Sequence, residues 1–364
     1  MSAFAAELVA LVPWDDEEHG LPSRLVDHPQ FSWRVPEHTR RVRAPVRVRL
    51  DPEGGLHLAG DGSGIVHLAQ DGSTRGRTPL AEHVGSLTDY ACDAEGNCAV
   101  LEDGGRLRGL DPGGRERWSV EAAFTKVLST SDRLYLPGQD GLAELDAASG
   151  SHLRTLPRRP GAGEPFLGGG RILAVVFDDE RELRGIEVLD PGGGDPDQLA
   201  GGDEHYAWLT YPFGADARSR LYAWRDGQVG RVALDGAIEV LGAVEGIALR
   251  GGAVYTSRPT TEGVVVTGPD GEATLSAPPG FRLISVDPDG RYRLMGGEAP
   301  DSAGELRTYG ADGSLEATAP APQDLATIDC RVPVFSAWQV DPDGRVIVPV
   351  VTPEGVAVVR LDWR

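Results

Sequence analysis

Histidine is the residue type in this chain best suited to proton transfer or metal binding near neutral pH, because its pKa lies close to neutrality. His57 and His67 fall on two neighbouring expected strands, nearly opposite each other across the segment 60–64. Such a cross-strand pair could bind a metal ion or act as a base. His205 follows Asp203 and Glu204 in an expected link between strands and is a further candidate. The alternative interpretation of the pair is two half-exposed strand histidines without chemistry.

Arginines dominate the segment 34–49, although the chain as a whole is acidic. The chain has 35 Lys+Arg against 56 Asp+Glu, which gives a formal net charge of -21. In this segment Glu37 is the one acid among six arginines, which are Arg34, Arg40, Arg41, Arg43, Arg47 and Arg49. As a continuous strand, the segment would carry four of them on one face. Two interpretations stay open: the arginines pair with the chain's own acids, or they form a basic stripe that binds a protein partner.

The cysteines and the first residues bear on the cellular location. Cys92 and Cys98 flank a turn-forming sequence, so they would lie close together across a hairpin, where a disulfide is geometrically possible. Cys330 stands alone. Residues 1–13 are apolar but lack a cationic start and precede four acids, a poor match to a secretory signal. We therefore predict a cytoplasmic location, with these cysteines as reduced, buried thiols.

Composition excludes several functional classes. A strongly acidic surface repels phosphate, which argues against nucleic-acid and anionic-membrane partners. No stretch approaches the roughly 18 apolar residues of a membrane span, so membrane insertion is not expected. The serine-hydrolase, phosphate-loop and zinc-peptidase motifs are absent from the sequence. We predict no cofactor and no metal.

One short phrase recurs along the chain and indicates the architecture. An apolar strand leads into Asp-Pro-Xaa-Gly or a similar turn, and further strands follow, separated by Gly-rich turns. Period-two alternation bounded by Asp, Gly and Pro is the signal of antiparallel hairpins. Units of about 30 to 45 residues, each with room for four strands, match the period of a propeller blade. The eight units are 46–80, 88–121, 125–157, 164–200, 207–242, 244–278, 281–320 and 335–364.

The predicted fold class is therefore all-β, a single β-propeller of eight four-stranded blades, or seven if one unit is misassigned, over residues 31–364. The last unit has room for three strands only. We expect the segment 31–45 to supply the fourth and close the ring, which would remove exposed sheet edges. Residues 1–30 are predicted to form a helical or extended arm, with a short helix over 2–12 that needs a surface to be stable.

The recurring phrase resembles NHL-type and related propeller repeats. The resemblance is closest in 48–58, 286–294 and 340–348, where a strand, an Asp-Pro-Xaa-Gly turn and a second strand follow one another. It covers most of the chain and implies a fold. Propellers of this kind are similar to components of phage-tail-like contractile particles, which would imply a structural role in a larger assembly.

Two functions follow as expectations. The first is a non-enzymatic scaffold or protein-recognition subunit that binds its partner through the arginine-rich arm and one rim of the propeller. The alternative is a lyase or hydrolase that acts on a small molecule in the central channel, with His57, His67 or His205 as base. A channel lined by convergent polar groups would favour the enzyme.

Overall fold

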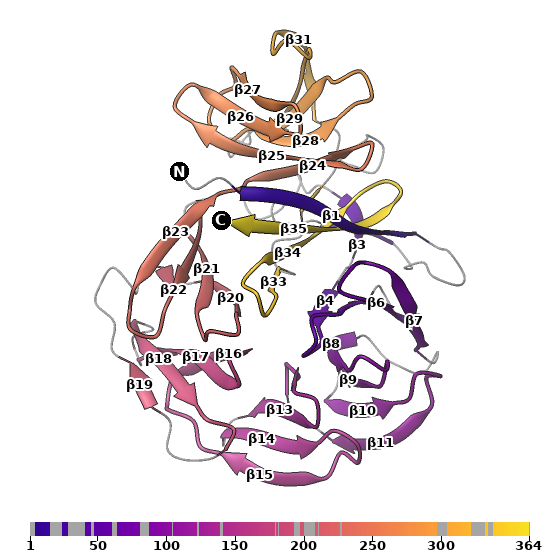
Figure 1. Cartoon of the computed structure of the whole chain (residues 1–364), viewed down its shortest axis with the longest axis vertical. Helices are drawn as coiled ribbons and strands as arrows, with labels where there is room; N and C mark the ends of the chain where they lie inside the picture. The colour runs from indigo at the N-terminus through magenta and orange to yellow at the C-terminus, as the bar shows by residue number, and fades with distance from the viewer. Residues whose placement is uncertain are drawn as a thin grey trace.

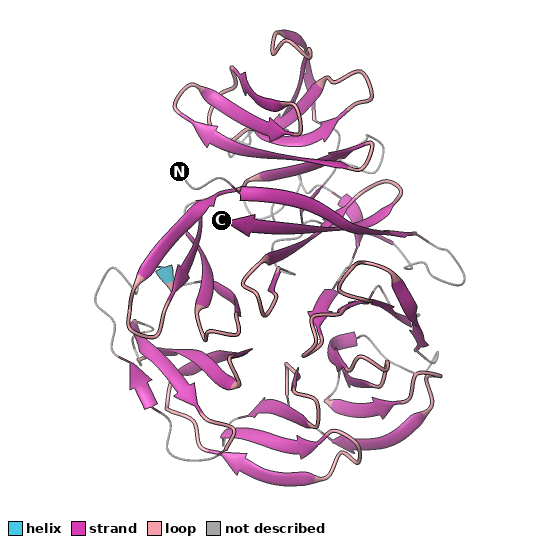
Figure 2. Ribbon diagram, in the orientation of Figure 1, coloured by secondary structure: helices cyan, strands magenta, loops and turns pink. Residues whose placement is uncertain are grey.

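The computed structural model of the chain consists of antiparallel β-sheets (Figures 1 and 2). It describes residues 4–14, 24–27, 41–44, 47–59, 64–80, 87–103, 105–121, 124–138, 141–178, 180, 182–192, 197–199, 208–209, 211–225, 228–296, 304–321, 332–333 and 338–363.

Seven four-stranded sheets are each made of consecutive strands. The first is β4 (Arg47–Leu50), β5 (Leu56–Ala59), β6 (Gly64–Leu68) and β7 (Thr74–Pro79). The second is β8 (Leu87–Cys92), β9 (Cys98–Glu102), β10 (Arg106–Leu110) and β11 (Glu116–Glu121). The third is β12 (Leu128–Ser129), β13 (Arg133–Gly138), β14 (Gly141–Asp146) and β15 (His152–Leu156). The fourth is β16 (Ala162–Gly168), β17 (Arg171–Phe177), β18 (Leu183–Leu189) and β19 (Asp197–Leu199).

The remaining sheets follow the same order. The fifth is β20 (Pro212–Ala215), β21 (Leu221–Arg225), β22 (Gln228–Val232) and β23 (Ile238–Ala243). The sixth is β24 (Gly246–Arg250), β25 (Ala253–Thr260), β26 (Gly263–Gly268) and β27 (Gly271–Leu275). The seventh is β28 (Arg282–Val286), β29 (Tyr292–Gly296), β30 (Glu305–Tyr309) and β31 (Leu315–Pro320).

The eighth sheet joins the two ends of the chain. Its central strands are β34 (Val346–Val351) and β35 (Gly355–Trp363), and the short strands β32 (Val332–Pro333) and β33 (Gln339–Val340) pair with opposite ends of β34. The outer strand is β1 (Phe4–Pro13), which pairs antiparallel with β35 along its whole length. Because β32 and β33 lie end to end along one side of β34, this five-stranded sheet is also four strands wide. The predicted all-β propeller with eight four-stranded units is confirmed.

Two predictions about the N-terminal part are wrong. The apolar segment near the start is strand β1 and not a helix, and β1, not the segment 31–45, completes the last sheet. Within that segment, β3 (Arg41–Ala44) pairs with β2 (Arg24–Asp27) in a separate two-stranded sheet. The physical reason is alternation along β1: Val12 and Trp14 are buried while Leu11 is exposed, a period of two that matches a strand. Pairing with β1 also satisfies the backbone hydrogen-bonding groups along the edge of β35. These groups would stay unpaired if the first residues formed a separate short helix.

Six of the eight sheets surround a central cavity (Figure 1). The cavity is lined by residues from the first five sheets and the eighth, and β33 contacts both β20 and β4, which closes this ring. The sixth and seventh sheets lie outside it, where β24 packs against β28 and β25 lies beside β1. They share a core of their own that includes Tyr255, Leu283 and Tyr309. The strand period predicts the units, but contacts between distant residues decide their placement.

The Asp-Pro-Xaa-Gly turns behave as their residue types require. In the first of them, the Gly54 amide donates to the Asp51 carbonyl oxygen at 3.0 Å, and Gly54 has a φ of 84°. Glycine is the residue that adopts such a conformation without steric cost. The Asp51 carboxylate accepts the amide hydrogens of Glu53 and Gly55, both at 2.8 Å. These bonds hold the start of β5, which carries the first candidate histidine.

Candidate functional site

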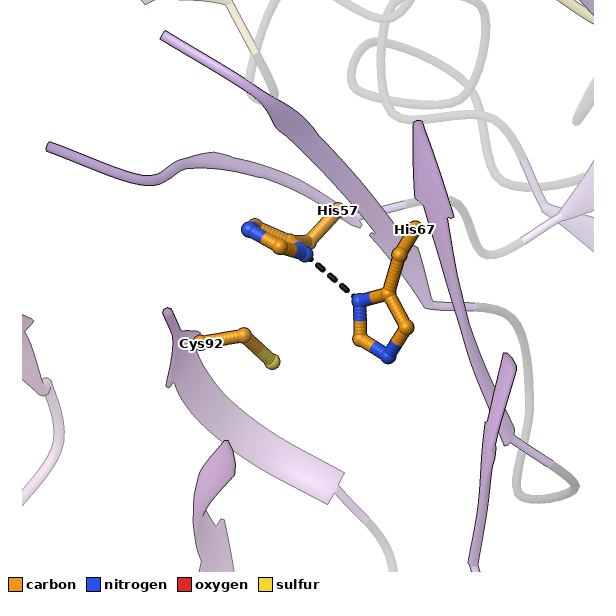
Figure 3. Close-up of side chains that lie close together, drawn as sticks. All are labelled: His57, His67 and Cys92. Atoms are coloured by element: carbon orange, nitrogen blue, oxygen red, sulfur yellow. Dashed lines mark hydrogen bonds between the residues drawn. The ribbon is translucent and has the colours of Figure 1, made fainter. Parts of the chain in front are cut away.

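The two strand histidines lie directly opposite each other inside the first sheet. His57 on β5 pairs in register with His67 on β6, and their side chains point toward one another (Figure 3). The ring centroids are 4.9 Å apart with an interplanar angle of 72°. His57 is 0% exposed and His67 is 4% exposed. The predicted cross-strand pair is therefore present as a buried pair.

A chain of hydrogen bonds assigns the hydrogens of the pair. The Thr78 hydroxyl donates to the Gly96 carbonyl oxygen at 2.9 Å, so His67 Nε2, 2.7 Å from that hydroxyl oxygen, acts as the donor to it. His67 Nδ1 then accepts from His57 Nδ1 at 2.6 Å. His57 Nε2 lies 3.4 Å from Asp51 Oδ2, at ion-pair distance. His57 Nδ1 therefore carries a hydrogen, and the other ring nitrogen, Nε2, faces the Asp51 carboxylate.

The pKa values of the neighbouring groups agree with this assignment. Burial, together with the positive charges of His57 and Arg75, lowers the pKa of His67 to about 3. His67 is therefore neutral across the physiological range. Burial alone would raise the pKa of Asp51, but the nearby His57 and the hydrogen bonds from backbone amides outweigh it, so this pKa is lowered. Asp51 is an anion beside His57.

A single substitution tests the hydrogen-bond chain. We expect Thr78→Val to destabilise the fold by about 1–3 kcal/mol, because it leaves His67 Nε2 and the Gly96 carbonyl oxygen buried without their shared partner. The measurement is urea unfolding. Thr155→Val is the matched control. Thr155 also lies on an outer strand and within hydrogen-bond distance of a histidine, but Thr155 is exposed. Equal losses in the two variants would contradict the buried chain.

Cys92 and Cys98 form a disulfide in the structure. The prediction of reduced thiols is therefore wrong for this pair. The reason is the register of β8 and β9, which places the two residues directly opposite each other with Cα atoms 4.1 Å apart. The geometric possibility that the hairpin sequence indicates is realised. Cys330 lies outside the described residues.

The central cavity has a volume of about 580 Å³, and Asp51, the acid beside His57, is one of its lining residues. Backbone atoms of Gly168, Gly169 and Gly170 and the side chains of Phe166 and Phe213 form part of its lining. Among the described residues that line it there is no histidine, because His57 and His67 are enclosed within their sheet. Their position does not support a role as base toward a ligand in the channel.

Two cations line the cavity, and each is paired with an acid of the same chain. Arg49 Nε donates to Asp89 Oδ1 at 2.9 Å, and Asp89 Oδ2 accepts the Val127 amide at 2.9 Å. Burial would lower the pKa of Arg49, but the charge of Asp89, its hydrogen bond and the nearby Tyr90 and Glu164 together outweigh burial, so the pKa is raised. Lys126 donates to Glu164 Oε1 at 2.5 Å, and burial lowers its pKa against the attraction of Glu164.

The arginine-rich segment is divided between different sheets, so the predicted continuous strand is wrong. Arg41 and Arg43 lie on β3, and Arg47 and Arg49 lie on β4. Arg47 donates to the carbonyl oxygens of Leu87 and Thr88 on β8. Among these arginines, the structure describes the side chains of Arg47 and Arg49. Arg49 pairs with an acid of the chain, as the intramolecular interpretation expects, whereas Arg47 binds backbone carbonyl oxygens. Arg34, Arg40 and His205 lie outside the described residues.

Sequence reasoning missed the acids and the lysine that complete these sites. Asp89 gives no local signal, because its partners come from β4 and from the residues before β12. Asp51 is explained by its turn, and its contact with His57 follows only from the fold. Lys126 carries the one available signal, since it is the only lysine in the chain.

No protein-family model matches the sequence, and no curated protein matches it. Solved structures are similar in fold. BamB from Moraxella catarrhalis is 17% identical, with 98% of this chain and 97% of that chain covered and a TM-score of 0.38. The WD40 domain of SCAP from fission yeast is 11% identical, with 99% and 98% covered and a TM-score of 0.46. The C-terminal WD40 domain of Sif2 is 11% identical, with 98% and 97% covered and a TM-score of 0.36.

The described part of the chain holds no helix with the length and apolar character of a membrane span. Identities this low concern the fold alone. The chain is a β-propeller protein, and its function has to be argued from its own residues.

Proposed function

We propose that this chain is a non-enzymatic β-propeller that recognises a protein partner, with the mouth of the central cavity as part of the contact surface. The observation that carries the proposal is the charge balance of that cavity. Among the described lining residues, the cations Arg49 and Lys126 pair with Asp89 and Glu164. The lining acids are Asp51, which faces His57 and Arg75, and Asp216, which pairs with Arg220. A ligand does not need to bring compensating charge, so backbone and apolar groups dominate what the cavity offers. This suits a protein segment more than an ionic metabolite.

The proposal also extends to the arginine-rich arm and one rim of the propeller as contacts with the partner. The arginines Arg34, Arg40, Arg41, Arg43, Arg47 and Arg49 stand as candidate partner contacts from sequence, and Arg47 and Arg49 also have partners inside the chain. The membership of a larger assembly, such as a phage-tail-like contractile particle in the cytoplasm, rests on the sequence resemblance. The ring itself supplies a rigid platform, since antiparallel pairing connects the strands within every sheet.

Because the chain has a single lysine, an amine-reactive cross-linker can be directed to the cavity. Lys126 lines the cavity, and its amine is the sole side-chain amine available to an amine-reactive cross-linker. A partner seated at the mouth is therefore expected to cross-link through Lys126. Lys126→Arg keeps the positive charge and removes the reactive amine, so it separates cross-linking from binding.

The experiment is purification of the full chain from its own host, with and without cross-linking. Ala217 is exposed at the cavity, and we expect Ala217→Trp to reduce the recovery of a stoichiometric partner by about tenfold or more, because a fully buried contact is worth more than about 1.4 kcal/mol. Ala311→Trp, an exposed alanine in the β30–β31 turn, is the matched control and leaves recovery unchanged. Equal recovery with both variants, or cross-links that persist in Lys126→Arg, would contradict the proposal.

A further inference from the structure

The histidine pair of the first sheet lies close to Cys92 of the second sheet (Figure 3). One donor atom each from His57, His67 and Cys92 lies within 4.8 Å of the other two, and all three side chains are buried. Apolar residues of both sheets, among them Ile65 and Val100, enclose this region. Two imidazoles and a cysteine sulfur are a donor set that zinc prefers.

The outer partners of the two rings are those of metal-binding histidines. His57 Nε2 faces the Asp51 carboxylate at 3.4 Å, and His67 Nε2 contacts the Thr78 hydroxyl at 2.7 Å. Carboxylates and other polar groups in this position orient a metal-binding imidazole. Each ring thus directs its other nitrogen, Nδ1, toward the opposite ring. The two Nδ1 atoms share one hydrogen at a distance of 2.6 Å.

A metal ion can take the place of that hydrogen after a small movement. Tetrahedral zinc with Zn–N bonds of 2.0–2.1 Å holds two ligand nitrogens about 3.4 Å apart. The rings therefore need to separate by about 0.8 Å from the present 2.6 Å. The Cys92 sulfur belongs to the same cluster. What prevents its use as a ligand is its bond to Cys98.

We propose that reduction of the Cys92–Cys98 disulfide opens a zinc site formed by His57, His67 and Cys92. A dithiol transfers two electrons and two protons to the disulfide, so the S–S bond becomes two thiols and the reductant becomes its own disulfide. The Cys92 thiol then releases its proton to solvent as the zinc–sulfur bond forms. The hydrogen between the two Nδ1 atoms is released in the same step. In the oxidised chain the site is closed, because the Cys92 sulfur is bonded to Cys98.

Two single variants distinguish a metal ligand from a structural disulfide. Cys98→Ser and Cys92→Ser both abolish the disulfide, so they share any loss of stability that follows from it. Cys98→Ser leaves Cys92 permanently free, and we expect it to bind one cobalt(II) ion per chain without reductant, with a thiolate-to-cobalt charge-transfer band. Cys92→Ser is expected to lack that band and to bind zinc at least about 100-fold more weakly, because even outer partners of a metal ligand are worth 10–100-fold.

The wild-type chain tests whether metal binding depends on reduction of the disulfide. The full chain is titrated with cobalt(II) or zinc(II) alone, before and after treatment with a dithiol that is removed by anaerobic gel filtration. We expect one metal ion per chain after reduction and none at this site before it. His67→Ala is expected to lose binding to the same extent as Cys92→Ser. Binding without a thiolate band, equal binding by the two serine variants, or no binding by reduced wild type and Cys98→Ser would each overturn the proposal.

Discussion

Replacing Val12 by aspartate is expected to destabilise the protein by about 3 kcal/mol or more, the cost of an unpaired carboxyl in an apolar core. Val12 is 3% exposed and packs on β1 with the cores of the first and last sheets, next to Leu56 and Val356. Its backbone lies opposite Val356 on β35. The substitution therefore weakens the strand that joins the two ends of the chain. Urea unfolding followed by tryptophan fluorescence measures the loss.

The adjacent residue provides a matched control for this prediction. Leu11 lies on the same strand and is 47% exposed, so Leu11→Asp places the same charge in solvent. We expect its effect to stay within about 0.5 kcal/mol. If the N-terminal segment formed a separate helical arm, the two aspartates would have similar small effects. That outcome would contradict the closing role of β1.

Replacing Asp89 by alanine is expected to cost about 2–3 kcal/mol, because it leaves the half-buried Arg49 guanidinium and the buried Val127 amide without their partner. The Asp89 side chain is 1% exposed and binds Arg49 through one oxygen and the Val127 amide through the other. It thereby connects β4, β8 and the residues before β12 at the cavity wall. The exposed pair Asp132–Arg133 is the control, and Asp132→Ala is expected to cost at most about 1 kcal/mol.

A double-mutant cycle separates the pair from its surroundings. Arg49→Met combined with Asp89→Ala is expected to be less destabilising than the sum of the single changes by about 1–3 kcal/mol, since the double variant leaves no unpaired charge. Strict additivity would show that Arg49 does not depend on Asp89. Arg49 would then be free to serve the partner contact that the sequence alone proposes for it.

The unequal success of the sequence-based predictions has a physical cause. The turns are local, since Asp51 and Gly54 make their bonds within five residues, and the Asp-Pro-Xaa-Gly pattern predicts them. The register of the histidine pair is also local, because one hairpin holds both residues. By contrast, the acidic partner of Arg49 is 40 positions away in the chain. No pattern in the neighbourhood of Arg49 indicates Asp89.

The sequence by itself determined the strand units, their turns and the opposition of His57 and His67, because alternation and turn chemistry act over a few residues. The tertiary structure decided which terminal strand completes the last sheet, which sheets surround the cavity and which stack outside it. It also decided that a histidine pair faces Cys92 and that the single lysine lines the cavity. These contacts join residues far apart in the chain, and they depend on how whole sheets pack, which no local pattern of residues specifies.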